Sequence, residues 1–181
     1  MTDPITQITQ LFAKFGNKTY GEACDQTTHA ISCAMHAQSE NADDNTIVAA
    51  LLHDIGHFIA DQEQRPGVDQ WGHKDHAQIG SNWLKNLGFP ASVYEPIRYH
   101  VEAKRYLYTK RTSALLSKAS STTLQQQGGL MTAQQMSQFE QSRFFTQAIC
   151  LRRYDDMGKP ETSLRQDLTP WLALVKRILK G

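Results

Sequence analysis

The sequence has little cysteine and no pronounced excess of charge of either sign. Its three cysteines, Cys24, Cys33 and Cys150, are odd in number and form no Cys-x-x-Cys pair, which argues for reduced thiols and against a disulfide framework or a zinc knuckle. Nineteen basic residues nearly balance eighteen acidic ones. The chain therefore lacks the charge pattern of a general nucleic-acid or anionic-lipid binder, and a small, defined ligand is the better expectation.

Long apolar runs are also missing. No apolar stretch approaches the length needed to span a membrane, and the first residues show no basic segment followed by an apolar one. We therefore expect a cytoplasmic protein that binds neither membranes nor nucleic acid.

What the sequence does contain is helical periodicity. A hydrophobic content of 40% over 181 residues suits a single domain with one core, which we expect to span residues 1–181. The fold class predicted is all-α, with no convincing strand. Helices are predicted over residues 3–15, 22–40, 45–59, 74–87, 91–107, 113–126, 132–154 and from 169 onward. Residues 16–22 form a candidate lid loop, and residues 61–72 form a long loop of the kind that is often functional.

An imidazole and a carboxylate stand next to each other in the apolar run 49–57, inside the predicted helix 45–59. Neighbouring helical side chains point about 100° apart, so His53 and Asp54 can bind one ion only where their side chains converge. Burying both without a partner would cost several kcal/mol, and a metal ion would remove that cost. The doublet therefore predicts a metal site.

Four histidines, His29, His53, His76 and His100, follow one another at intervals of 24, 23 and 24 residues. Each interval is about one helix plus one loop, so the four side chains could converge on one interior site of a helical bundle. Imidazole and carboxylate without thiolate suit iron or manganese, and also zinc or cobalt. Four histidines are enough for two ions bridged by Asp54.

A further carboxylate is expected, and Asp155 or Asp156 can supply it because both follow the long helix 132–154. The alternative for this pair is a helix end exposed to water, and spacing alone does not choose. The His53-x-x-x-His57 spacing could also bind zinc, but the protease pattern needs a glutamate where Asp54 stands.

In these motifs the chain resembles the HD-domain superfamily, whose metal ligands follow the order His, His-Asp, Asp. The resemblance is closer to the mixed-valent diiron oxygenases that cleave the carbon–phosphorus bond of 1-hydroxyphosphonates, and it covers roughly residues 20–159. Its marks are residues 49–57, 76–80, 100–107, 127–129 and 152–155.

The resemblance implies an HD-domain helical bundle with a diiron site in its core, which is Fe(II)/Fe(III) mixed-valent in the active form. By position, the first iron would be held by four residues, His29, His53, Asp54 and Asp155. Asp54 would bridge to a second iron, which His76 and His100 would hold. The choice of Asp155 over Asp156 rests on the family match.

The resemblance also implies a substrate pocket. His57 and Lys104 would be catalytic, and the anion-binding residues would be His57, Lys104, Ser120, Thr123 and Arg152. Glu22 would receive a substrate ammonium. The family's lid tyrosine stands three residues before that glutamate, where this chain has Thr19, and Tyr20 is one residue nearer.

The reaction implied is a four-electron oxidation by O2 that converts (R)-2-amino-1-hydroxyethylphosphonate to glycine and phosphate. One alternative is the same reaction on the trimethylammonio analogue, giving glycine betaine and phosphate. Another is an HD-type metal-dependent phosphohydrolase. Against the hydrolase, His57 stands where many such enzymes have a lysine, and the Gly-Tyr-Pro signature of the cyclic-dinucleotide enzymes is absent. A ligand sensor would be favoured only if metal ligands were missing.

Overall fold

The computed structural model describes residues 3–110 and 117–180, and its regular structure is almost entirely helical. The predicted all-α class is therefore confirmed. The helices are α1 (Pro4–Phe15), α2 (Gln26–Ser39), α3 (Asp44–Leu52), α4 (Ile55–Gln62), α5 (His76–Asn86), α6 (Ala91–Thr109), α7 (Lys118–Gln126), α8 (Ala133–Glu140), α9 (Phe145–Met157) and α10 (Thr169–Lys180). Among the described residues, no helix is both long enough and apolar enough to cross a bilayer.

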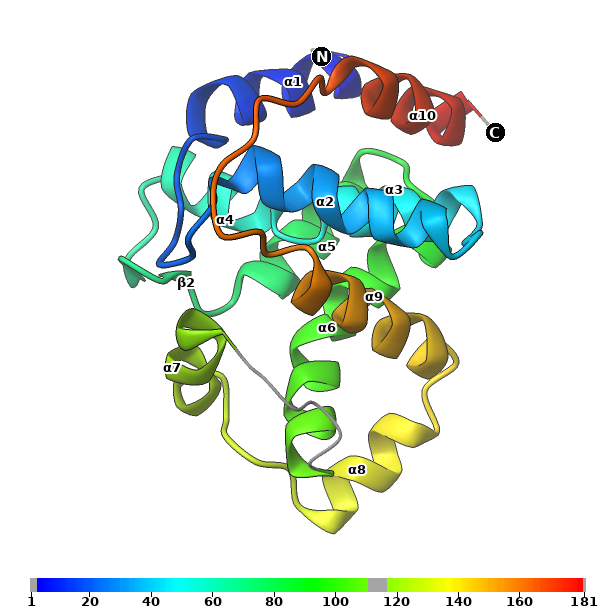
Figure 1. Ribbon diagram of the computed structural model, residues 1–181. Helices are drawn as coiled ribbons and strands as arrows, with labels where there is room; N and C mark the ends of the chain where they lie inside the picture. Colours follow the sequence, from blue (N-terminus) through cyan, green and yellow to red (C-terminus); the bar gives the residue numbers. More distant parts are fainter. Residues whose placement is uncertain (1–2, 111–116, 181) are drawn as a thin grey trace.

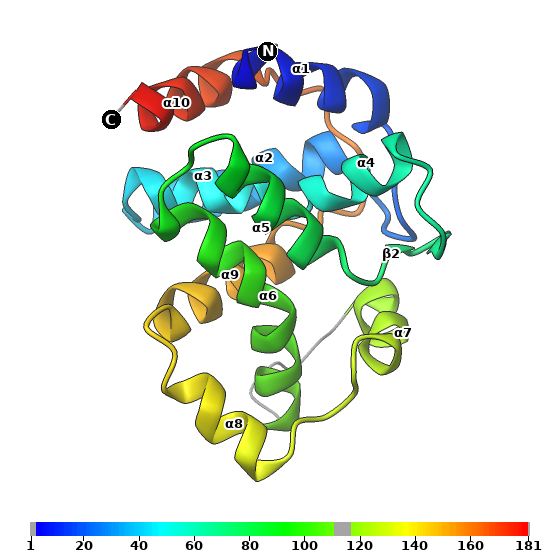
Figure 2. The same ribbon diagram turned by 180° about the vertical axis from the view of Figure 1, so that it is seen from behind.

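The helices form a layered bundle. Helices α1 and α10 lie side by side over α2, α3 and α4 at the end where both termini lie (Figure 1). The same arrangement seen from behind brings α4 and α5 to the front (Figure 2). Below this layer α6 packs against α5, α9 and α3. The main core lies among these helices, and a smaller aromatic cluster joins α6 to α8 and α9.

The predicted helix 45–59 is wrong in one respect that matters for the site, because the chain breaks at the His-Asp doublet. Helix α3 ends at Leu52, and α4 starts at Ile55. His53 keeps helical angles, while Asp54 has φ −98° and ψ 5° and serves as the N-cap of α4. The doublet therefore sits at a helix junction, where side chains escape the fixed 100° spacing of a continuous helix.

Other predicted boundaries shift as well. The helix predicted over 22–40 starts only at Gln26, after a capping Asp25, and the one predicted over 132–154 is divided into α8 and α9 by a turn at 141–144. Thr132 and Gln135 form a capping box at the start of α8. The predicted start of a helix at residue 113 lies outside the described residues.

The long loop predicted over 61–72 is partly structured. Helix α4 continues to Gln62, and strand β1 (Val68–Asp69) pairs antiparallel with β2 (Gly72–His73). Periodicity could not reveal strands of two residues, so the expectation of no strand fails at this hairpin alone among the described residues.

Two glycines allow helices to approach closely enough to bring site residues together. A Cβ on Gly56 of α4 would lie 1.9 Å from the backbone oxygen of His76 on α5. A Cβ on Gly158, just after α9, would lie 2.3 Å from Cys33 Sγ on α2. Because neither contact is tolerable, the absence of a side chain at these positions sets the α4–α5 and α2–α9 distances.

Candidate metal centre

The six predicted ligand side chains meet in the interior from five parts of the fold. His29 comes from α2, the doublet from the α3–α4 junction, and the others from the start of α5, the middle of α6 and the end of α9. The five besides Asp54 are buried: His29, His53, His76, His100 and Asp155. Residues spread over 127 sequence positions, from 29 to 155, thus form one cluster.

One set of side chains gathers around the Oδ2 atom of Asp54. His29 Nε2 lies 3.2 Å from His53 Nε2, and the two nitrogens lie 3.6 and 3.4 Å from Asp54 Oδ2. Asp155 Oδ1 completes the set at 3.4 Å from His29 Nε2 and 3.8 Å from His53 Nε2. Two imidazole nitrogens and two carboxylate oxygens therefore surround one point.

A second set gathers around the other oxygen of the same carboxylate. His76 Nε2 lies 3.0 Å from His100 Nε2, and these nitrogens lie 3.3 and 3.8 Å from Asp54 Oδ1. Asp54 thus presents one oxygen to each pair of histidines. This is the arrangement that a carboxylate bridging two cations would need.

The hydrogen bonds of the four histidines fix which ring nitrogen is free. Each Nδ1 lies within 2.6–2.9 Å of a backbone carbonyl oxygen, which can only accept a proton, so Nδ1 carries the hydrogen. In a neutral ring of this kind, Nε2 carries no proton and has a free lone pair. Two such nitrogens 3.0–3.2 Å apart cannot hydrogen bond to each other. A metal ion between them would remove the repulsion, so the donor set fits cations.

His57 differs from these four rings. Its Nδ1 accepts a hydrogen bond from the backbone N–H of His73 at 2.9 Å, so the proton of the neutral ring is on Nε2. That Nε2 lies 3.9 Å from Asp54 Oδ1, and the ring stacks on His76 with 3.9 Å between centroids. His57 is therefore set up to donate a hydrogen bond into the site, and its tautomer does not suit it to bind metal through Nε2.

For three of the six predicted ligands, burial and neighbouring charges favour the ionisation state that a metal ligand requires. Burial and the adjacent rings of His76 and His53 lower the pKa of His100 to about 3. Burial would raise the pKa of Asp54, but the surrounding histidines hold it well below its usual range. Burial acts in the same direction on Asp155, whose pKa is nevertheless lowered by Arg152 and Lys159. His100 is thus neutral and the two carboxylates are charged near neutral pH. For His29, burial would lower the pKa, but Cys33 and Asp155 raise it well above its usual range.

The structure also distinguishes Asp155 from Asp156. Asp155 is buried with one oxygen against His29 and the other accepting a 2.6 Å hydrogen bond from Arg152. Among the described residues, Asp156 pairs only with Arg152. The alternative of a helix end exposed to water therefore does not apply to Asp155.

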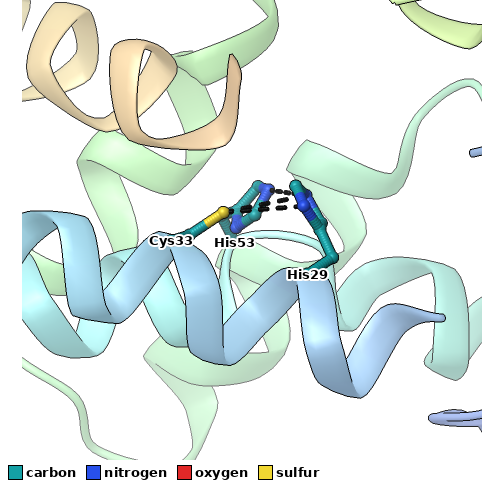
Figure 3. Close-up of side chains that lie close together, drawn as sticks. All are labelled: His29, Cys33 and His53. Carbon is teal, nitrogen blue, oxygen red and sulfur yellow. Dashed lines mark hydrogen bonds between the residues drawn. The ribbon is translucent and has the colours of Figure 1, made fainter. Parts of the chain in front are cut away.

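Cys33 is a neighbour of the first set that sequence reasoning treated only as a structural thiol. It lies one helical turn after His29, and the two side chains lie close together beside His53 (Figure 3). Its Sγ is 3.6 Å from His29 Nδ1 and 3.9 Å from Nε2. The four-residue spacing from His29 was the signal available in the sequence.

A cavity opens beside the cluster, with a volume of about 480 Å³ including its open mouth. The predicted anion-binding residues line it together. Lys104 Nζ, on α6, donates to Thr123 Oγ1 at 3.0 Å, and Arg152 NH2 donates to Ser120 Oγ at 3.2 Å.

Lys104 is the cation of this cavity that has no counter-ion. Within residues 3–110 and 117–180, no carboxylate oxygen lies within ion-pair distance of its ammonium, whose partners are neutral oxygens of Ser120 and Thr123. Burial, together with the guanidinium of Arg152, lowers the pKa of Lys104 to about 7. Arg152, by contrast, is neutralised by Asp155 and Asp156. An anion entering the cavity would therefore find its partner in Lys104.

Two loops also line the cavity: the one that contains Tyr20 and the β1–β2 hairpin turn that contains Trp71. Tyr20 has φ 44°, its ring lies 4.7 Å from that of His57, and its hydroxyl donates to Asp61. Trp71, at the turn of the β1–β2 hairpin, packs over Gly21. Thr19 is exposed, so of the two lid candidates it is Tyr20 whose side chain faces the cavity.

Glu22, the predicted receiver of an ammonium, also lines the cavity, and its carboxylate is bound to Lys159. Sequence reasoning gave Lys159 no role, although it stands one helical turn after Asp155 and contacts it at 3.2 Å. Its position beyond the end of α9 concealed the contact, because the chain leaves the helix at Gly158.

Comparison with known proteins identifies a family model that matches the chain and proteins that are similar to it over most of its length. The family model described as "HD domain" matches residues 27–125, which is more than half of the chain. A protein named hydroxymethylphosphonate dioxygenase, from Gimesia maris, is 35% identical over 97% of this chain and 88% of its own length. Another, named [1-hydroxy-2-(trimethylamino)ethyl]phosphonate dioxygenase (glycine-betaine-forming), from Leisingera caerulea, is 32% identical over 93% of this chain and 87% of its own length.

Proposed function

Because the chain belongs to the HD-domain family and is similar over almost its whole length to proteins named as phosphonate dioxygenases, we propose that it is an iron-dependent oxygenase that cleaves the carbon–phosphorus bond of a 1-hydroxyphosphonate. The reaction consumes one O2 and yields phosphate and a carboxylic acid. One observation carries the proposal, which is that Asp54 turns one oxygen to each of two histidine pairs.

We infer that this centre holds two iron ions, as a mixed-valent Fe(II)/Fe(III) pair in the active enzyme. His29, His53 and Asp155 would hold one ion, His76 and His100 the other, and Asp54 would bridge them. The imidazole and carboxylate donors suit iron. When bound, the ions supply the activation of O2 and the transfer of electrons.

The protein's own contribution is to bind and orient the substrate. Lys104 would pair with the phosphonate, since its ammonium lacks a counter-ion and lies beside the hydroxyls of Thr123 and Ser120. Arg152 would add a second donor while it holds Asp155. His57, with its proton on Nε2, would donate a hydrogen bond to a substrate oxygen.

The loops would exclude water from the reaction. Tyr20 and Trp71 line the cavity and would cover it when the loops close, and a closed site prevents reactive species from escaping. In this proposal the loop over residues 16–22, a candidate lid from its sequence, would serve as the lid.

The head group of the substrate is the finer part of the proposal. The sequence predicts (R)-2-amino-1-hydroxyethylphosphonate, whose products would be glycine and phosphate. One relative's name gives its substrate no substituent on the hydroxymethyl carbon, and the other's gives a trimethylammonium group. The amino substrate therefore stays a prediction within the class of 1-hydroxyphosphonates.

The test is to load the protein with Fe(II) under a mild reductant and follow O2 uptake and phosphate release together. We expect one phosphate for each O2 with a 1-hydroxyphosphonate, and no phosphate from the matched phosphonate without the hydroxyl. Phosphate release without O2 uptake would favour the phosphohydrolase and reject the oxygenase.

A further inference from the structure

Lys159 already forms an ion pair with Glu22, the carboxylate that a substrate ammonium would need. Its Nζ lies 3.0 Å from Glu22 Oε1, 2.9 Å from Ser120 Oγ and 3.2 Å from Asp155 Oδ1. A lysine ammonium has three protons to donate; Glu22 and Ser120 accept two hydrogen bonds, and Asp155 forms an ion pair with the same ammonium. The ammonium thus already has two hydrogen-bond acceptors and two carboxylates beside it.

Glu22 is equally well provided for. The same Oε1 accepts a second hydrogen bond, at 2.6 Å, from the hydroxyl of Ser117, which caps α7. The side chains of Glu22 and Lys159 are each 13% exposed. The carboxylate therefore has an internal cation and a hydroxyl donor in a place that water hardly reaches, and such pairs are costly to separate.

A positively charged substrate head group would disturb the ion pair between Glu22 and Lys159. To reach Glu22 it would have to share the carboxylate with Lys159 or displace the lysine, leaving a buried ammonium with one partner fewer. Lys104 lines the same cavity, and its ammonium adds further positive charge. A neutral head group requires no such rearrangement, so the site penalises the charged one.

Building on the proposed function, we propose that Lys159 is a specificity-determining residue that takes the place of a substrate ammonium, so that this enzyme selects 1-hydroxyphosphonates whose head group carries no positive charge. This class includes hydroxymethylphosphonate and 1-hydroxyalkylphosphonates. It departs from the amino substrate that the sequence predicts.

The first experiment separates charge from size. It compares 2-amino-1-hydroxyethylphosphonate with 1-hydroxypropylphosphonate of the same configuration, in which a methyl group replaces the ammonium, and includes hydroxymethylphosphonate as the smallest substrate. Binding to the iron-loaded protein is measured without O2 by calorimetry, and phosphate release is measured with O2. We expect the neutral isostere to bind at least tenfold more tightly than the amine and to have the higher kcat/KM.

The second experiment uses variants of Lys159. In Lys159→Met the preference should move at least tenfold toward the amine, because Glu22 becomes free to receive it. Lys159→Arg keeps a cation and should keep the neutral preference. Both affinities are measured on the same preparation, so any loss of iron or of folded protein affects them alike, and iron content is determined for each variant.

The outcomes distinguish this inference from the function on which it rests. If wild-type protein prefers the amine, or if Lys159→Met leaves the ratio unchanged, the inference is wrong and the oxygenase stands. If Lys159→Met does not fold, the wild-type ratio still decides. If none of the three phosphonates is bound and oxidised, the proposed function is wrong and the inference falls with it.

Discussion

The two sides of the cavity are built differently. On the side of the histidine cluster every functional group comes from a helix or a helix junction, and each Nδ1 is held by a backbone carbonyl. On the opposite side the groups come from the loop around Tyr20 and Glu22 and from the hairpin turn at Trp71. There the contacts join side chains, such as Tyr20 with Asp61 and Glu22 with Lys159.

The difference indicates a division of tasks. Rigid helices tied by backbone hydrogen bonds can keep ligand atoms at fixed separations, which a metal centre requires. Loops joined by a few polar contacts can open at low cost, which substrate entry requires. Changes on the helical side should therefore affect metal and chemistry, whereas changes on the loop side should affect substrate choice and closure.

The strongest test of the helical side is Asp54→Asn. The variant removes the charge that faces both histidine pairs, so we expect iron content to fall for both ions. Activity should fall by more than the roughly 100-fold that losing an outer partner of a metal ligand can cost. Metal analysis and O2 uptake measure the two effects. Full iron content in this variant would contradict the bridging role.

Lys104→Gln tests whether one helical residue serves the substrate and not the metal. We expect phosphonate binding to weaken about 10- to 100-fold, the value of a hydrogen bond to a charged group, with iron content unchanged. Calorimetry without O2 and metal analysis give both values. Lys118→Gln, at an exposed lysine of α7, is the matched control and should bind normally. Loss of iron from Lys104→Gln would overturn its assignment.

The pH dependence of binding gives a smaller but more specific signal. The pKa of Lys104 is lowered to about 7, so its ammonium is present below that pH and is lost as the pH rises above it. Affinity for the phosphonate should then fall by up to about tenfold per pH unit above 7. Lys104→Arg, which stays charged, should lack this fall. Because the ligand's own titration is common to both proteins, equal profiles would refute the prediction.

The smallest effect is expected on the loop side, from Tyr20→Phe. The ring can still stack on His57 but loses the hydroxyl contact to Asp61, so closure should be less stable and kcat should fall by less than about tenfold. Thr19→Val is the control, because Thr19 is exposed, and should leave kcat unchanged. If Thr19→Val lowered kcat more than Tyr20→Phe, the assignment of the lid role to Tyr20 would be wrong.

Much of the site could be foreseen from local signals. The even spacing of His29, His53, His76 and His100, together with one His-Asp doublet, was enough to predict a common metal site, and the apolar periodicity was enough to predict helices. Spacing did not choose between Asp155 and Asp156, because that choice depends on how α9 faces α2 at the contact of Gly158 with Cys33.

The sequence by itself therefore determined the helical class and the residues able to bind a metal, because periodicity and residue chemistry are local properties. The tertiary structure alone decided that the doublet lies at a helix junction, that His57 has the opposite tautomer to its neighbours, and that Lys159 pairs with Glu22. These three features depend on hydrogen bonds between residues distant along the chain or on a break that propensity does not mark, and only folding brings such partners into contact.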